Sequence, residues 1–407
     1  MYRVIVLFLC FAFAELSAQD LAVDKLREFG YENIRTGNTE TGYWITIEDR
    51  VHRSVYKGID EAVEVLLDTA EDTKDVDLII LKNRIPLLKI HLSHKLLMQY
   101  RLKEISGAEV IKRLDIVYDT DNYRNKKPLK KPVNSSAGKI DLVFYPQIGL
   151  ANYRLDKLYV VDISVAPALE MQLWPGARFT GQVIFPVYNN LKGEVDYIRP
   201  GILALSQSFR MRDNVFGSLH IGNFSDNRMG TAVELGYRSN GGYWGIGGKA
   251  GLTGASTFYN GRWEVADWKR VNFALKGYAY VPVWNVRFDL SAGQYVFGDR
   301  GGRLDCMRYF GEVAVGFYAM YSGKEVNGGF NFSVPLPGRK RKRSGSFSVR
   351  VMLPEYFNWE YEAQSGPVYK NRKLGRTYQV HPEGPRDWYN PLYIKDNLIN
   401  SNEIKQK

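Results

Sequence analysis

The amino-acid sequence predicts a mainly β protein, in which a small α+β domain precedes an antiparallel β-barrel of roughly 12–14 strands. Three observations lead to this prediction. The 407 residues include 38 Gly, 27 Tyr and 20 Phe, a mixture that suits strands and turns better than helices. Between residues 139 and 353, apolar and polar residues alternate over about a dozen segments of roughly ten residues each. Turn-forming pairs such as Asn189-Asn190 and Asp226-Asn227 separate these segments.

The N-terminal segment predicts export from the cytoplasm. Residues 1–3 carry a positive charge, and the apolar stretch that follows them is too short for a membrane helix. A small residue ends the Leu-Ser-Ala sequence at 16–18, so residues 1–18 are predicted to be a signal peptide. Lipidation at Cys10 is the weaker alternative, because a large residue, Leu9, precedes it. Cleavage leaves Cys306 as the single thiol and therefore excludes an intramolecular disulfide.

Composition and charge exclude several classes of protein. With 45% hydrophobic and 14% aromatic residues, the chain does not have the composition of a disordered protein. Mean hydropathy is −0.31, and no later apolar run approaches the about 20 residues of a spanning helix. The net charge of +11 first suggests a nucleic acid, which an exported protein rarely meets. Residues 139–353 hold 26 basic and 16 acidic residues, and five of the basic ones form the run 339–343.

Residues 19–118 predict a solvated α+β domain, and the basic stretch at 119–138 predicts a linker. Apolar residues at helical spacing in 21–29 stop at Gly30, a common helix terminator. The rest of the domain gives strand and helix patterns without a motif that requires chemistry. We expect strands at 43–47, 76–81, 87–92 and 114–118, and helices at 59–67 and 94–105.

From 139 to 353 the pattern has the two-residue period of half-buried strands. Val286 and Phe288 lie on one face and Arg287 lies on the other. Long strands with one apolar face are typical of an outer-membrane β-barrel, because in lipid a closed ladder alone pairs every backbone group. A soluble β-sandwich is the alternative, although its strands are usually shorter. The polar tail at 354–407 is expected in the lumen, on the periplasmic side, or as one further strand.

No catalytic or metal-binding motif stands out, and we expect neither an enzyme nor a cofactor. His91 and His94 have no third ligand at metal spacing. His220 alternates with apolar residues and is predicted to line the lumen, with Ser208 or Glu234 on neighbouring strands. A barrel enzyme of the lipase or protease type is therefore one alternative. A porin for small solutes is another.

Two groups of charged residues are the candidate ligand contacts. Mixed charges that face the lumen suit a hydroxyl-rich sugar. The basic run after Gly338 is expected to be an exposed connector whose charge suits the phosphates of lipopolysaccharide or an acidic polysaccharide. A solvated loop without a ligand is the equal alternative. The lumen candidates are Arg287, Asp289, Arg303 and Asp305, and the connector candidates are Arg339, Arg341 and Arg343.

Short blocks of sequence, in a fixed order, carry a resemblance to a known family. One block is FTGQVIFPVYNNL at 179–191, and another is SAGQYVFGDRG at 291–301. Through these blocks the chain resembles the YjbH/GfcD family of exopolysaccharide and capsule outer-membrane proteins. Further blocks lie at 197–201, 308–311, 315–319 and 329–336, and in the N-terminal domain at 30–34 and 47–50.

The resemblance implies a non-catalytic role in polysaccharide export or secretion, as a conduit or as a docking component. It implies a place in the outer membrane of a Gram-negative cell, with the 19–118 domain in the periplasm. The partners that it implies are outer-membrane lipid, polysaccharide and periplasmic export or assembly proteins. No nucleic acid is expected, and the oligomeric state is left open.

Overall fold

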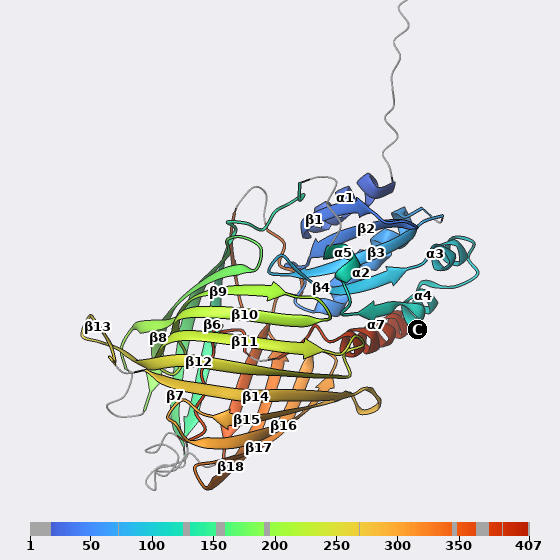
Figure 1. The fold of residues 1–407 in the computed structure, drawn as a ribbon. Coiled ribbons are helices and arrows are strands. Elements are labelled where there is room, and N and C mark those ends of the chain that lie inside the picture. Colours follow the sequence, from blue (N-terminus) through green and yellow to red (C-terminus); the bar gives the residue numbers. More distant parts are fainter. Residues whose placement is uncertain are drawn as a thin grey trace, which may run out of the picture.

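A small α+β layer and a large curved sheet make up the molecule (Figure 1). The computed structural model describes residues 18–71, 73–124, 131–151, 159–190, 196–267, 269–343, 348–363, 374–384 and 386–405. The predicted signal peptide lies outside these ranges, apart from Ala18. Strands make up 55% of the chain and helices 17%, which confirms the prediction of a mainly β protein. No helix in the described ranges combines the length and the apolar character needed to cross a membrane.

The N-terminal domain is a five-stranded sheet with its strands in sequence order. β2 and β3 run parallel because α2 crosses between them, and the other neighbours are antiparallel. The strands are β1 (Glu32–Asn38), β2 (Gly42–Glu48), β3 (Asp75–Lys82), β4 (Ile85–Leu92) and β5 (Asp115–Val117). The helices are α1 (Ala18–Phe29), α2 (Val55–Thr69), α3 (His94–Arg101), α4 (Gly107–Arg113) and α5 (Asp121–Arg124).

Local signals explain where these helices begin and end. Gly30 follows α1 with a φ of 100°, a conformation that a side chain would strain. The hydroxyls of Ser93 and Ser106 each accept a backbone N–H in the first turn of α3 and of α4. The helix predicted at 94–105 is therefore present but ends at Arg101, and Ser106 starts a second helix, α4, that the sequence analysis did not predict.

The large sheet has fifteen strands, and fourteen of them lie on one path of neighbours. β13 (Arg262–Val265) stands beside this path and pairs with β12. From β6 to β18 each strand on the path is antiparallel to the next along the chain, as the turn signals predict. The strands are β6 (Ile140–Ala151), β7 (Val160–Gln172), β8 (Ala177–Asn189), β9 (Arg199–Arg210), β10 (Val215–Phe224), β11 (Arg228–Arg238), β12 (Trp244–Tyr259), β14 (Arg270–Val281), β15 (Val286–Gln294), β16 (Arg300–Phe310), β17 (Val313–Ser322), β18 (Glu325–Pro335), β19 (Val349–Met352) and β20 (Tyr356–Glu362).

One stretch of chain lies at both edges of this sheet. β19 pairs parallel with β6, and β20 pairs antiparallel with β18. The connection from β19 to β20 is residues 353–355. The two edges approach each other, since the Trp359 indole N–H of β20 donates to the Ile148 carbonyl of β6 at 2.8 Å. Among the described residues no ladder joins β20 to β6, so backbone pairing does not close a barrel.

The C-terminal segment runs back through the concave side of the sheet. Tyr378 stacks on Phe224 of β10, with ring centroids 5.1 Å apart. Glu383 accepts a hydrogen bond from Arg178 of β8 at 2.8 Å. Because later residues reach β15 and β16 as well, the described part of 374–390 crosses the interior of the sheet.

The helix α7 (Pro391–Lys405) follows this segment and packs on the N-terminal domain (Figure 1). Asn390 begins the helix, because its Oδ1 accepts the N–H two residues on, at 2.9 Å. Ile394 and Leu398 join one hydrophobic cluster with α2 and α4. The polar tail predicted at 354–407 thus contains a further strand, a crossing segment and a helix. Alternation does not reveal the helix, since its apolar residues do not gather on one face.

Ion pairs fix the N-terminal domain against the end of the large sheet. The Asp141 side chain, at the start of β6, is 2% exposed and contacts three guanidinium groups. They belong to Arg50 at 2.5 Å, Arg343 at 2.6 Å and Arg350 at 2.9 Å. Glu312, in the turn after β16, pairs with two basic side chains of the N-terminal domain. Each carboxylate is desolvated but fully partnered, so the position of the domain depends on them.

We expect Asp141→Ala to destabilise the protein strongly. The change leaves three guanidinium groups without their shared carboxylate, and removing one partner of a buried ion pair costs about 3–5 kcal/mol. Urea unfolding of the purified variant, followed by tryptophan fluorescence, should show a free energy of unfolding lower by that amount. Asp267→Ala changes an exposed turn residue and should have an effect below about 0.5 kcal/mol. A variant at Asp141 as stable as the wild type would contradict this role.

Candidate functional site

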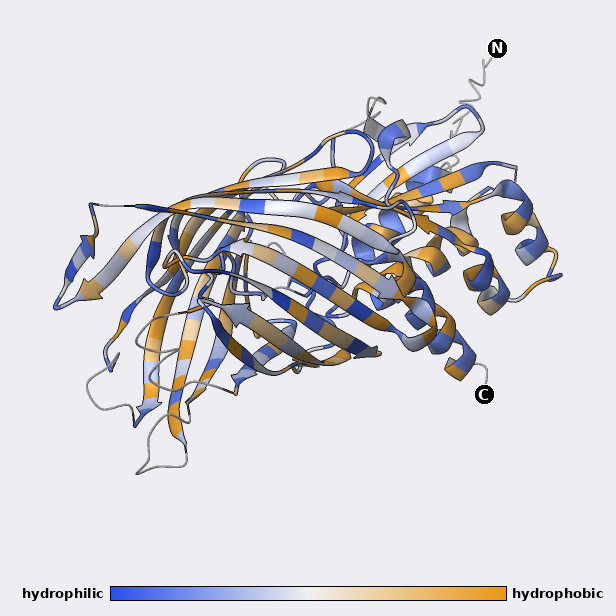
Figure 2. Ribbon diagram, turned by 60° about the horizontal axis from the view of Figure 1, so that its bottom comes forward, coloured by the Kyte–Doolittle hydropathy of each residue, from blue (hydrophilic) through white to orange (hydrophobic). Residues whose placement is uncertain are grey.

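The large sheet has an apolar outer face and a polar inner face. Along β10, Leu219 and Ile221 are 51% and 57% exposed, whereas His220 between them is 6% exposed. Figure 2 shows the same alternation of hydrophobic and hydrophilic residues along neighbouring strands. A protein in water normally buries its large apolar side chains, so this polarity is inverted. Buried polar residues of the inner face include Thr180, Gln182, Ser206, Asn223, Thr253, Asn272 and Asn331.

The first part of the crossing segment, 374–384, lies directly over these inner residues. The backbone N–H of Gln379 donates to the Ser225 hydroxyl at 2.9 Å, and the Ser225 N–H donates to the Gln379 carbonyl at 3.0 Å. Gly251 of β12 allows the ring of Tyr378 to approach, because a Cβ there would lie 2.0 Å from its hydroxyl. The segment is therefore fitted to the inner face.

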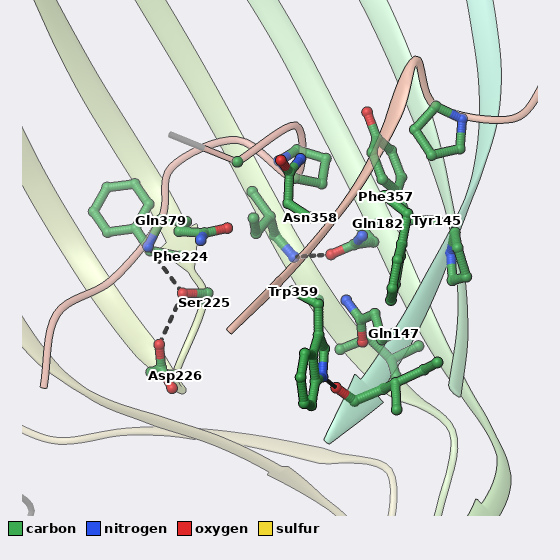
Figure 3. A pocket seen from close by; sticks show the side chains of 18 of the residues that line it. Tyr145, Gln147, Gln182, Phe224, Ser225, Asp226, Phe357, Asn358, Trp359 and Gln379 are labelled. Atoms are coloured by element: carbon green, nitrogen blue, oxygen red, sulfur yellow. Dashed lines mark hydrogen bonds between the residues drawn. The ribbon is translucent and has the colours of Figure 1, made fainter. Parts of the chain in front are cut away.

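A pocket of about 380 Å³ lies between this segment, strands β8 to β10 and the facing edges of β6 and β20 (Figure 3). Its lining combines both faces of the sheet. Ile148 is exposed on the outer face, whereas Gln182 is buried on the inner face. The pocket therefore lies at the place where the two edges are unpaired. Its volume falls in the usual range of small-ligand sites, about 300–1,000 Å³.

The pocket contains three side-chain amides with an unused hydrogen-bonding atom. In each amide one of the two polar atoms forms a hydrogen bond, and the other has no partner among the described residues. Gln182 accepts a backbone N–H of β9 at 3.3 Å through Oε1, and its Nε2 is buried and unpaired. Asn223 donates to a backbone carbonyl of β9 at 2.7 Å, and Asn358 donates to the Glu383 carbonyl at 2.9 Å. Both Oδ1 atoms are buried and unpaired. One hydrogen-bond donor, Gln182 Nε2, and two acceptors, the Oδ1 atoms of Asn223 and Asn358, are therefore unpaired among the described residues.

The rest of the pocket suits an uncharged ring with hydroxyl groups. Amides exchange hydrogen bonds with hydroxyls, and flat aromatic faces cover C–H groups. No basic side chain lines the pocket in the described part of the chain, which disfavours a phosphate or a carboxylate as ligand. Glu360 in the wall is already held by Arg303 at 2.7 Å. The aromatic residues of the lining are Tyr145, Phe224, Tyr356, Phe357 and Trp359.

The structure brings the predicted lumen residues together in pairs. Arg287 contacts Asp289 at 2.8 Å, and Arg303 contacts Asp305 at 2.7 Å. Neither pair lines the pocket, although Arg303 reaches its wall through Glu360. Their role as ligand contacts stays a prediction.

The basic run is not the exposed connector that the sequence predicts. Arg341 is 9% exposed and donates to a backbone carbonyl, and Arg343 pairs with Asp141 and with Glu32 of β1. The expectation of exposure is therefore wrong for these two residues, because backbone carbonyls bind Arg341 and acidic groups far away in the sequence bind Arg343. Arg339 is exposed, and a phosphate contact by it stays a prediction.

His220 meets two hydroxyls that the sequence analysis did not select. Its Nδ1 lies 2.8 Å from the Ser206 hydroxyl, and its Nε2 lies 2.8 Å from the Ser218 hydroxyl. These serines take the places expected for Ser208 or Glu234. Both ring nitrogens are occupied by hydroxyls, so no carboxylate orients the imidazole as in a catalytic triad.

His91 and His94, the two histidines considered as metal ligands, each contact a different aspartate. His91 Nδ1 lies 2.8 Å from Asp77, and His94 Nδ1 lies 2.9 Å from Asp75. In the ranges that the structure covers, no group of three ligating side chains could hold a metal ion.

No family model and no curated protein matches this chain. The family resemblance therefore stays a prediction, and function has to be argued from the site.

The sequence analysis missed the pocket amides Gln182, Asn223 and Asn358. Alternation places Gln182 on the inner face, but no sequence signal distinguishes it from other inward polar residues.

Asp387 anchors the crossing segment by charge. It pairs with Arg238 at 3.4 Å and with Arg287 at 3.3 Å. Burial opposes its ionisation, but the two guanidinium groups outweigh burial and lower the pKa of Asp387 to about 2. A carboxyl group whose pKa is lowered by folding stabilises the fold above its unfolded pKa, and this stabilisation is lost as the pH falls through the folded value.

We expect Asp387→Asn to reduce the free energy of unfolding by about 2 kcal/mol at pH 6. The difference from the wild type should shrink as the pH falls below about 4 and vanish only well below pH 2, where Asp387 is protonated and both proteins are uncharged at this position. Urea unfolding at a series of pH values measures it. Asp267→Asn serves as the control and should match the wild type at every pH. A difference that does not depend on pH would contradict the charge-based account.

Proposed function

We propose that this protein is an outer-membrane β-barrel that takes part in exopolysaccharide or capsule export as a non-catalytic docking component. The observation that carries the proposal is the inverted polarity of the large sheet. In water the exposed apolar side chains of its outer face would form a large unfavourable surface. In a bilayer the same face meets hydrocarbon while the polar face lines the interior.

The pairing at the sheet edges supports closure in a membrane. Twelve strands alternate in direction on the path from β6 to β18, and residues 349–362 add a thirteenth. After twelve alternating strands β6 and β18 run in opposite directions, so a strand placed between them is parallel to one of them. A closed barrel with an odd number of strands therefore has one parallel pair. The pairing of β19 with β6 is such a pair. Lipid offers no hydrogen bonds to an open edge, which favours the pairing of residues 349–362 with both edges.

The turns support a periplasmic N-terminal domain. Outer-membrane barrels have short turns on the periplasmic side and longer loops outside. The turn from β16 to β17 has two residues, Gly311 and Glu312, and Glu312 pairs with the N-terminal domain. In the turn after β9, the Asp213 N–H donates to Asp121 of that domain at 3.1 Å. The domain therefore covers an end of the sheet at which strands are joined by short turns.

The occupied interior favours docking over an open conduit. The described residues of 374–390 cross the interior and are held there by Asp387 and Glu383. A polymer would have to displace it. The pocket beside the segment offers amides and aromatic rings, a combination that suits sugar units.

Deletion of the gene tests the role in export. We expect loss of surface polysaccharide with accumulation of the polymer in the periplasm, measured by sugar analysis of both fractions. The wild-type protein should fractionate with the outer membrane. Folded protein in the soluble periplasm would contradict the barrel, whereas normal surface polysaccharide would contradict the export role. Bilayer conductance without a polysaccharide defect would point to a small-solute porin.

A lumenal hydrolase is a second candidate, favoured by the contacts of His220 with Ser206 and Ser218. Without a carboxylate on the imidazole we expect no hydrolysis. Purified wild type and His220→Gln should cleave p-nitrophenyl esters and a casein substrate at the same background rate. A wild-type rate well above background that His220→Gln abolishes would favour the hydrolase instead.

A further inference from the structure

We infer that the pocket binds an amphiphile with an uncharged sugar head, whose hydrocarbon chain leaves through the unpaired edges of β6 and β20. We call these facing edges, residues 144–151 of β6 and 356–362 of β20, the seam. The inference rests on the proposed membrane location, because the chain of the amphiphile has to meet lipid outside the wall. It goes further in naming the class of ligand and the route by which it enters.

The seam exists because the thirteenth strand changes partners. β19 pairs with the first four residues of β6, 140–143. Pro354, which has no backbone N–H to continue a ladder, lies where the chain leaves β6 for β18. Beyond it, the hydrogen bond that joins the two edges in the described part of the chain runs from the Trp359 indole to the Ile148 carbonyl. One side-chain contact is far easier to open than a ladder of backbone hydrogen bonds.

The inner half of the pocket recognises a polar, uncharged group. The unpaired Nε2 of Gln182 is a donor, and the unpaired Oδ1 atoms of Asn223 and Asn358 are acceptors. Gln182 and Asn223 are 4% and 5% exposed, so leaving these atoms without partners is costly. Hydroxyl groups donate and accept, and they can satisfy all three. A phosphate or carboxylate head would find no cation in the described lining.

The outer half of the pocket is apolar. Ile148 and Trp359 belong to the lining, and Ile148 is exposed on the outer face. Trp359 packs near Phe330 and Phe332, which lie beside the pocket, with ring centroids 5.8 Å and 5.5 Å apart. A hydrocarbon chain that leaves through the seam lies along these side chains and continues into lipid. The polar and apolar halves meet at the seam, which is the arrangement that a ligand with a sugar head and an acyl or alkyl chain requires.

Photo-crosslinking on the full-length protein in phosphatidylcholine nanodiscs tests this. The probe is an alkyl glucoside whose chain carries a diazirine, and its partner is the same chain on a phosphocholine head. We expect the glucoside to label residues of the seam at least about 5-fold more than the phosphocholine probe. Asn223→Ala should lower this labelling about 5-fold, the effect of one lost hydrogen bond.

Asn331→Ala is the matched control. Asn331 is also a buried inward amide whose Nδ2 is bonded and whose Oδ1 is unpaired, but it lies outside the pocket. Its labelling should equal that of the wild type. Equal labelling by both heads, equal loss in both variants, or binding of free glucose as tight as the glucoside would overturn the inference. Failure of the membrane location would appear separately, as soluble protein in fractionation.

Discussion

A strand inserted between β6 and β18 has to run parallel to one of them, and much of the molecule follows from this constraint. Residues 349–352 pair with the parallel strand β6 over four residues, and residues 356–362 pair with the antiparallel strand β18. Antiparallel pairing is somewhat more stable per residue than parallel pairing. The chain therefore leaves β6 after four residues, and the seam and its pocket are the result.

The same stretch of chain decides where the C-terminus lies. After β20 the chain has left the end of the sheet that carries the N-terminal domain, and it returns to that end through the interior. There α7 completes a hydrophobic cluster that begins with Ala22 and Leu26 of α1 and ends with Leu398. The α+β domain and the large sheet thus share one core, which is why we expect the removal of their common ion pairs to affect the stability of the whole protein.

Alternation predicts the strands well because each one has a single apolar face. Asp226 and Asn227 both have positive φ, near 55°, as the turn signal between β10 and β11 predicts. Contacts distant in sequence are a different matter. Arg343 donates a hydrogen bond to Asp141, which is 202 residues away in the sequence. The local sequence around either residue does not predict this contact.

The start of α7 is less easily predicted from the sequence than the strands, but more easily than the distant contacts. Asn390 followed by Pro391 is a helix-start signal that periodicity alone overlooks, since Asn caps the first turn and Pro needs no partner for a missing N–H. The pocket amides carry no such local signal. Their spare atoms become visible when β8, β10 and β20 are placed around one space, so the candidate site is a property of the tertiary structure.

The ion pairs of the domain contact and the neutral amides of the pocket lie in different parts of this molecule. Residues 19–121 carry 15 basic and 20 acidic residues, and the basic run of the sheet region meets some of those acids at the domain contact. The net charge of +11 thus serves in part to hold the two parts together. The pocket depends instead on neutral amides and aromatic rings, whose hydrogen bonds and packing are not screened by salt as ion pairs are. Ionic strength should therefore act most on the exposed pairs of the domain contact, such as Lys340 with Glu61, and little on the pocket that we propose as a ligand site.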